Sequence, residues 1–67
     1  MNATEAIEIA RTHLKTAGYE YFRAKSSKQH PDREAFDVIA DVGTLNYTWM
    51  RLVIDPSGEV LEQDQID

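Results

Sequence analysis

The residues that could carry out chemistry are few in this 67-residue chain, and they stand apart from one another. The histidines, His13 and His30, lack a second ligand at metal spacing, since Ile9 and Ala17 stand four residues either side of His13. The chain has no cysteine, which excludes thiol catalysis, disulfide bonds and cysteine-based zinc sites. We therefore expect no metal site and no cofactor, and we assign the histidines partly exposed structural roles.

The serines and the C-terminal carboxylates also lack the neighbours that catalysis or cation binding requires. No base stands next to a serine in a recognisable motif. The carboxylates could attract a divalent cation weakly, but no Asp-x-Asp-x-Asp-Gly loop orders their oxygens. A solvated edge strand is the favoured interpretation of these residues, which are Glu59, Glu62, Asp64 and Asp67. We expect a protein that is not an enzyme, because a chain this short rarely encloses a deep cleft.

The net charge of −5 argues against a nucleic-acid-binding surface, which needs clustered cations. Acidic residues interrupt the one group of basic residues, Arg23, Lys25, Lys28 and Arg33. No apolar stretch approaches the roughly 20 residues that span a bilayer, and the first residues do not resemble a signal peptide. We expect a cytoplasmic protein that binds neither nucleic acid nor membrane, although a mature secreted fragment would look the same.

The elements that position these residues follow from the spacing of apolar residues. A stripe at helical spacing predicts a helix over residues 3–17, formed by Ala3, Ile7, Ala10, Leu14 and Ala17. Asn2 and Glu5 form a predicted capping box, and Gly18 supplies a left-handed stop. Beyond Gly18 the period becomes two, which predicts strands over residues 19–25, 35–42, 47–54 and 59–66, with a mobile loop over 26–33.

These elements predict one small α+β domain over residues 1–67. We expect the N-terminal helix to pack on one face of a three- to four-stranded antiparallel meander sheet. The stretch from Asp55 to Gly58 suits a type I turn, because Asp, Pro and Gly each stand where the turn prefers them. The pairs expected across this turn are Ile54 with Val60, Val53 with Leu61 and Arg51 with Gln63.

A loop near residues 44–46 would join the preceding pair of strands. The core-facing residues of the two strands then lie on the same face of the sheet, provided that Ile39 lies opposite Arg51 and Asp37 opposite Val53. Arg51 would lie diagonally between Asp37 and Asp41, within reach of either carboxylate.

This register leaves apolar residues on the sheet face that the helix does not cover. Such a face is usually polar, so we expect it to bind a partner protein or a second copy of the chain. The expected binding residues are Ile39, Tyr47, Trp49, Arg51, Val53 and Leu61. Two other interpretations of Trp49 stay open: it fills the core if the strand faces are reversed, or it forms a small-ligand platform.

Two further hypotheses belong to other functional classes. The first is a small-molecule or peptide site in a pocket between helix and sheet, near His13, Tyr21 and Met50. The second is an enzyme fragment that works only in a larger assembly, for which no particular residue argues.

A helix with "AIEIARTHL", followed by strands that end in "VIDPSGEVLE", resembles the arrangement of PepSY-type domains over most of the chain. The residues that carry the resemblance are Ile54, Asp55, Gly58, Glu59, Val60 and Leu61. The resemblance implies a helix packed on an antiparallel sheet and a non-catalytic module that binds or restrains another protein, as peptidase propeptides do. Domains of that type are typically exported or membrane-attached, and often paired, which differs from what this sequence predicts.

Overall fold

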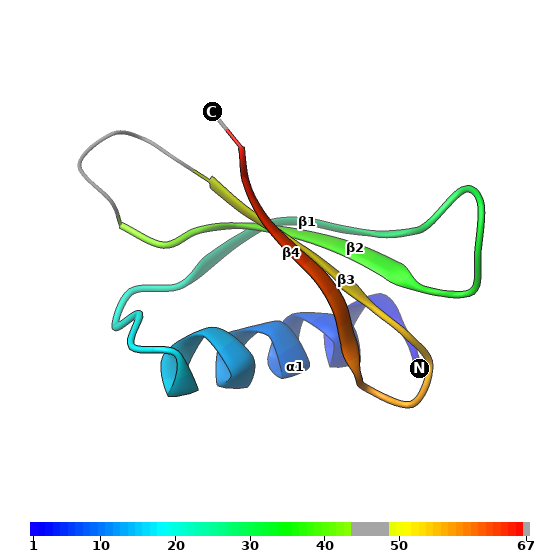
Figure 1. The fold of residues 1–67 in the computed structure, drawn as a ribbon, viewed down its shortest axis with the longest axis horizontal. Coiled ribbons are helices and arrows are strands. Elements are labelled where there is room, and N and C mark those ends of the chain that lie inside the picture. The colour runs from blue at the N-terminus through cyan, green and yellow to red at the C-terminus, as the bar shows by residue number, and fades with distance from the viewer. Residues whose placement is uncertain (44–48, 67) are drawn as a thin grey trace.

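One helix and four strands follow each other along the chain. The computed structural model describes residues 1–43 and 49–66. The elements are α1 (Ala3–Thr16), β1 (Arg23–Gln29), β2 (Phe36–Asp41), β3 (Trp49–Ile54) and β4 (Val60–Ile66). The strands form one antiparallel sheet in the order β1-β2-β3-β4, and α1 lies across one face (Figure 1). The predicted α+β class, with one N-terminal helix on a meander sheet, is confirmed.

The ends of α1 follow the predicted chemistry. The Asn2 side chain accepts a hydrogen bond from the Glu5 backbone N–H, and the Glu5 carboxylate accepts one from the Asn2 N–H. At the other end, Gly18 adopts a φ of 105° and donates to the Lys15 carbonyl, while the Tyr19 N–H donates to the Leu14 carbonyl. This is a Schellman arrangement, which satisfies carbonyls that the end of the helix leaves free.

The buried stripe of α1 differs in part from the predicted one. The fully buried residues are Ala6, Ala10 and Leu14, at a spacing of four. Ala17 is exposed because it is the residue at the helix end rather than part of the last buried turn. Small residues at positions 6 and 10 let the helix lie close to the sheet, where the core contains Val38, Val42, Met50, Leu52 and Ile54.

The first strand lies four residues later than predicted. Residues 26–29 belong to β1, so the prediction of a mobile loop over 26–33 is wrong for that part. The polar sequence suggested a loop because β1 is an edge strand with few buried side chains. The Ser27 hydroxyl donates to the Ala3 carbonyl at 2.9 Å, which joins β1 to α1 through a polar contact. Apolar periodicity cannot detect such a contact.

The register between β2 and β3 is the predicted one. Asp37 lies opposite Val53, and Ile39 lies opposite Arg51. The predicted loop at 44–46 lies outside the described residues, as do Tyr47 and Thr48.

The predicted turn is confirmed, but the register beyond it is not. The Gly58 N–H donates to the Asp55 carbonyl at 2.9 Å, and Ile54 lies opposite Val60. A register shift then makes Leu61 an extra residue. The observed partners are Val53 with Glu62 and Arg51 with Asp64, so the predicted pairs with Leu61 and Gln63 are wrong. A bulge of this kind reverses the faces of all the residues that follow it.

Candidate functional site

Trp49 lies on the sheet face opposite α1. Its neighbour Met50 is only 2% exposed and belongs to the core under the helix, whereas Trp49 is 40% exposed. The Lys25 ammonium stands 5.3 Å from the centre of the Trp49 ring, within range of a cation–π contact. The interpretation of Trp49 as a core residue under the helix is therefore wrong.

We call the face that points away from α1 the outer face. Strand alternation and the observed register assign to it Arg23, Ser26, Lys28, Asp37, Ile39, Asp41, Trp49, Arg51, Val53, Glu62, Asp64 and Ile66. Trp49 lies directly opposite Ile66, and Ile39 directly opposite Arg51. Four of the six predicted binding residues, Ile39, Trp49, Arg51 and Val53, therefore share this face with Ile66, which was not predicted.

Val53 belongs to the outer face by register but is not available for binding, because it is 0% exposed. Its cross-strand neighbours are Asp37 and Glu62. Asp37 forms an ion pair with Arg51, and Glu62 forms one with Arg33 from the segment between β1 and β2. These ion pairs place two arginine side chains, whose stems can cover apolar surface, beside the neighbours of Val53.

The other two predicted residues do not extend the outer face in the described structure. Leu61 is 41% exposed, but it is the unpaired residue of the bulge and does not lie opposite Val53. Tyr47 lies outside the described residues. The apolar area of the outer face is thus concentrated around Trp49, Ile39 and Ile66. The signal that sequence reasoning missed is the bulge, which turns Ile66 toward this face.

The two edge strands of the sheet carry charges of opposite sign. The cations Arg23, Lys25 and Lys28 come from β1 at one edge, and the carboxylates Glu62 and Asp64 come from β4 at the other. Arg51 lies between, with guanidinium nitrogens 3.5 Å from the carboxylate oxygens of Asp37 and Asp64. The contact with Asp37 was predicted.

The Asp37 Oδ1 atom is buried and receives no hydrogen bond from the described residues, even though an Arg51 nitrogen is 3.5 Å away. The contact is therefore an ion pair without an aligned N–H. The guanidinium compensates the negative charge of Asp37 but donates no hydrogen bond to its Oδ1 atom. Asp41, the other predicted partner of Arg51, instead accepts a hydrogen bond from the Gly43 N–H at 2.8 Å.

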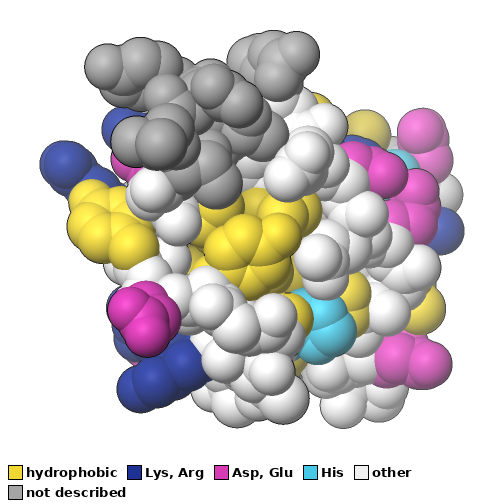
Figure 2. All heavy atoms as spheres, turned by 60° about the vertical axis from the view of Figure 1, so that its left-hand side comes forward, with side chains coloured by type: hydrophobic (Ala, Val, Ile, Leu, Met, Phe, Trp, Pro, Cys, Tyr) yellow, Lys and Arg dark blue, Asp and Glu magenta, His cyan; other side chains and the backbone are white. Residues whose placement is uncertain are grey.

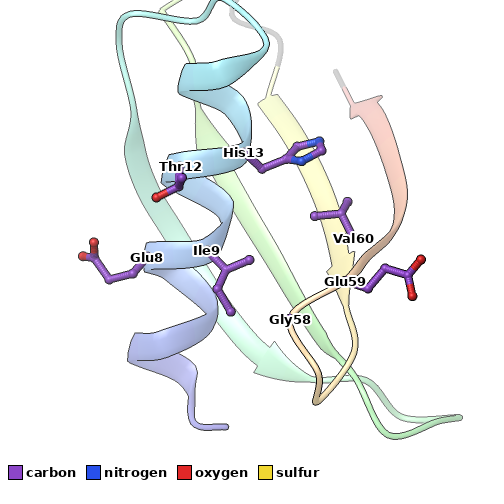
Figure 3. A pocket seen from close by; sticks show the side chains of 7 residues that line it. All are labelled: Glu8, Ile9, Thr12, His13, Gly58, Glu59 and Val60. Atoms are coloured by element: carbon purple, nitrogen blue, oxygen red, sulfur yellow. The ribbon is translucent and has the colours of Figure 1, made fainter.

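A second candidate site is a groove between α1 and β4. The helix packs against β1, β2 and β3, so β4 extends beyond it (Figures 1 and 3). The space between them measures about 610 Å³ and is lined by Glu8, Ile9, Thr12, His13, Gly58, Glu59 and Val60. The half-buried side chains of Ile9 and Val60 pack against the core and make the groove apolar at its base.

This groove differs from the predicted pocket. Of the three predicted lining residues only His13 takes part, and its Nε2 atom lies 2.8 Å from the Gln63 side-chain oxygen, which joins α1 to β4. Met50 is enclosed in the core, and Tyr21 is half exposed in the segment that follows α1. Figure 2 shows that hydrophobic side chains also reach the surface at the end of the molecule where α1 ends.

The remaining candidates for chemistry have structural partners. His30 accepts a hydrogen bond from the Asp32 N–H through Nδ1 at 3.0 Å. Ser57 donates its hydroxyl to Asp55 within the turn. Within residues 1–43 and 49–66, no cluster of three or more His, Asp or Glu side chains is placed to hold a metal ion. No helix in that part of the chain is long and apolar enough to cross a membrane.

Comparisons with models of protein families, with curated proteins and with solved structures gave no match.

Proposed function

We propose that the protein is a non-catalytic interaction module that binds a second copy of itself through the outer face. The observation that carries this proposal is the position of Trp49, which is 40% exposed on the face that α1 leaves uncovered. Tryptophan is enriched among the residues that dominate binding energy, because it buries a large area at a small entropic cost. Ile66 lies opposite it on β4 and enlarges the apolar contact.

The opposite charges of the edge strands β1 and β4 support a second copy as the partner. In a two-fold dimer each surface patch meets itself, so the patch must be self-complementary. A two-fold axis between two facing sheets and parallel to their strands places β1 of one copy over β4 of the other. The cations Arg23, Lys25 and Lys28 then face the carboxylates Glu62 and Asp64 of the other copy. Exposed pairs contribute only about 0–1 kcal/mol each, so they orient the dimer rather than hold it together.

The size of the outer face predicts a weak dimer. Four strands spaced about 4.8 Å apart and about 20 Å long present roughly 400 Å² per copy. Two copies would bury roughly 800 Å² in total, below the usual size of stable interfaces. We therefore expect a dissociation constant on the order of 10–100 µM, which suits a transient or regulated association.

The PepSY-type resemblance is compatible with this function, because it implies a helix on an antiparallel sheet and a binding role without catalysis. We also propose that the protein is related to PepSY-type domains and that it is cytoplasmic. A different protein as the partner is the alternative outcome of the test below.

Sedimentation velocity across 5–500 µM protein, a range chosen to bracket about 10–100 µM, tests the proposal. We expect the wild type to shift from monomer toward dimer, and Trp49→Ala to remain monomeric over the same range. Thr12→Ala, which changes an exposed residue of α1 on the opposite layer, is the control and should dimerise like the wild type. A wild type that stays monomeric at the highest concentration contradicts self-association and leaves a different protein as the partner.

A further inference from the structure

The groove between α1 and β4 is open to solvent and is bordered by two contacts. At one end the His13 ring nitrogen meets the Gln63 side-chain oxygen at 2.8 Å. At the other end Ile9 lies against Gly58, whose missing side chain would come within 3.4 Å of the Ile9 Cδ1 atom. Between them the space of about 610 Å³ falls in the usual range for ligand sites. The groove therefore has room for one or two apolar side chains.

A carboxylate beside the groove favours a positively charged occupant. Glu8 and Glu59 belong to the lining, but Figure 3 shows the Glu8 carboxylate pointing away from β4 and the Glu59 carboxylate pointing away from α1. Glu8 is paired with Arg11 on α1, whereas Glu59 forms no ion pair with any described residue. Glu59 is thus a carboxylate beside the groove, directed away from α1, that is free to meet a cation.

The edge of the sheet beside the groove is also unpaired. β4 has β3 as its one neighbour among the described strands, so the backbone groups along its other side are open to an added strand. An extended peptide can pair with such an edge through main-chain hydrogen bonds, while side chains on one face enter a neighbouring pocket. Side chains on the other face of an added strand would lie beside Glu62 and Asp64.

We infer that the free edge of β4 and the groove together bind an extended peptide in which apolar and basic residues alternate. The apolar side chains lie over Ile9 and Val60, and the basic ones lie near Glu59 and the carboxylates of β4. The same carboxylates oppose pairing of this edge with its own copy, because like charges would then meet. The apolar part of the site lies on the side of the sheet opposite Trp49, whereas Glu62 and Asp64 also belong to the outer face, so peptide and second copy would compete for these two carboxylates.

A titration with a fluorescent eight-residue peptide of alternating valine and lysine tests the inference, with a valine–glutamate peptide as the comparison. The protein is kept near 5 µM, below the dissociation constant of about 10–100 µM that we expect for the dimer. We expect the lysine peptide to bind, the glutamate peptide not to bind, and the amide NMR signals of β4, Ile9 and His13 to shift. Equal binding of both peptides, or shifts confined to other elements, overturns the inference.

Two variants locate the binding, and a third controls for net charge. Glu59→Lys reverses the charge at position 59 and should weaken binding of the lysine peptide about fivefold. Thr12→Phe places a large side chain in the lining of the groove and should weaken binding of the lysine peptide at least as much. Glu20→Lys makes the same change in net charge outside the groove and should leave the affinity unchanged. An equal loss in Glu59→Lys and Glu20→Lys shows attraction by net charge alone and contradicts a site in the groove.

Discussion

The carboxylate of Asp55 accepts three hydrogen bonds within its own turn: from the Ser57 hydroxyl, the Ser57 N–H and the Glu59 N–H, at 2.6, 3.0 and 2.9 Å. The hydroxyl of Ser57, followed by the Glu59 N–H, lowers the pKa of Asp55 below its usual value. A lowered pKa in the folded state means that the ionised carboxylate stabilises the fold.

This linkage gives a prediction for Asp55. The stabilisation is fully present above the unfolded-state pKa and is lost as pH falls through the lower pKa of the folded state. Asp55→Asn removes the charge but keeps an oxygen that can accept hydrogen bonds. We expect the difference in unfolding free energy between wild type and variant to be largest near neutral pH and to shrink in acid.

Urea unfolding of both proteins between pH 7 and pH 2 measures that difference. The other carboxylates change the stability of both proteins equally, so their effect cancels in the comparison. A difference that stays constant over the whole range contradicts the account of Asp55.

At the residue scale, the sequence allowed some roles to be predicted better than others. The roles of Asp55 and Gly58 follow from local chemistry, since a turn restricts which residues fit it. The exposure of Trp49 follows from alternation in β3. The burial of Val53 does not, because its neighbour Glu62 pairs with Arg33 from a distant segment, and this arrangement is known only in the folded protein. Long-range contacts between charged side chains leave no periodic signal.

At the scale of elements, strand alternation located β2 and β3 but misplaced β1. The sequence of β1 is polar because it lies at the edge of the sheet, and a polar edge strand has the composition of a loop. The bulge at Leu61 was missed for a different reason. It brings Asp64 opposite Arg51 and leaves Gln63 in contact with His13, and these partners are known only once the sheet has formed.

The start of α1 gives a prediction at this scale. Asn2→Ala removes the side-chain acceptor of the capping box and should cost about 1 kcal/mol of unfolding free energy. For a domain of this size the melting temperature should fall by about 4–8 °C.

Asn2→Ser is the matched control, because serine also caps helices, and it should melt close to the wild type. The comparison belongs at low protein concentration, where dimer formation does not add to stability. Equal melting of the alanine and serine variants contradicts a stabilising cap.

At the scale of the whole molecule, the fold class was predicted because one amphipathic helix followed by alternating strands has few compact solutions. The groove could not be predicted in the same way. It arises because α1 packs mainly on β1, β2 and β3 and leaves a space beside β4, and this depends on where the helix docks rather than on its pattern. The molecule therefore presents two surfaces on opposite sides of one sheet: the outer face around Trp49 and the groove beside β4.

The central claim is that the outer faces of two copies meet with β1 over β4. Because the chain has no cysteine, Lys28→Cys introduces one thiol at which a nitroxide label can be attached on β1, and it leaves Arg23 and Lys25 in place. Labelled protein is mixed with an isotopically labelled wild type that carries no nitroxide, so any broadening of NMR signals arises between copies. A label at Lys15→Cys, on α1 in the opposite layer, is the control.

The account predicts that the label at position 28 broadens the amide signals of β4 around Glu62, and that the label at position 15 does not. Broadening centred on β1 or α1, or no broadening at concentrations where the wild type sediments as a dimer, contradicts the proposed arrangement.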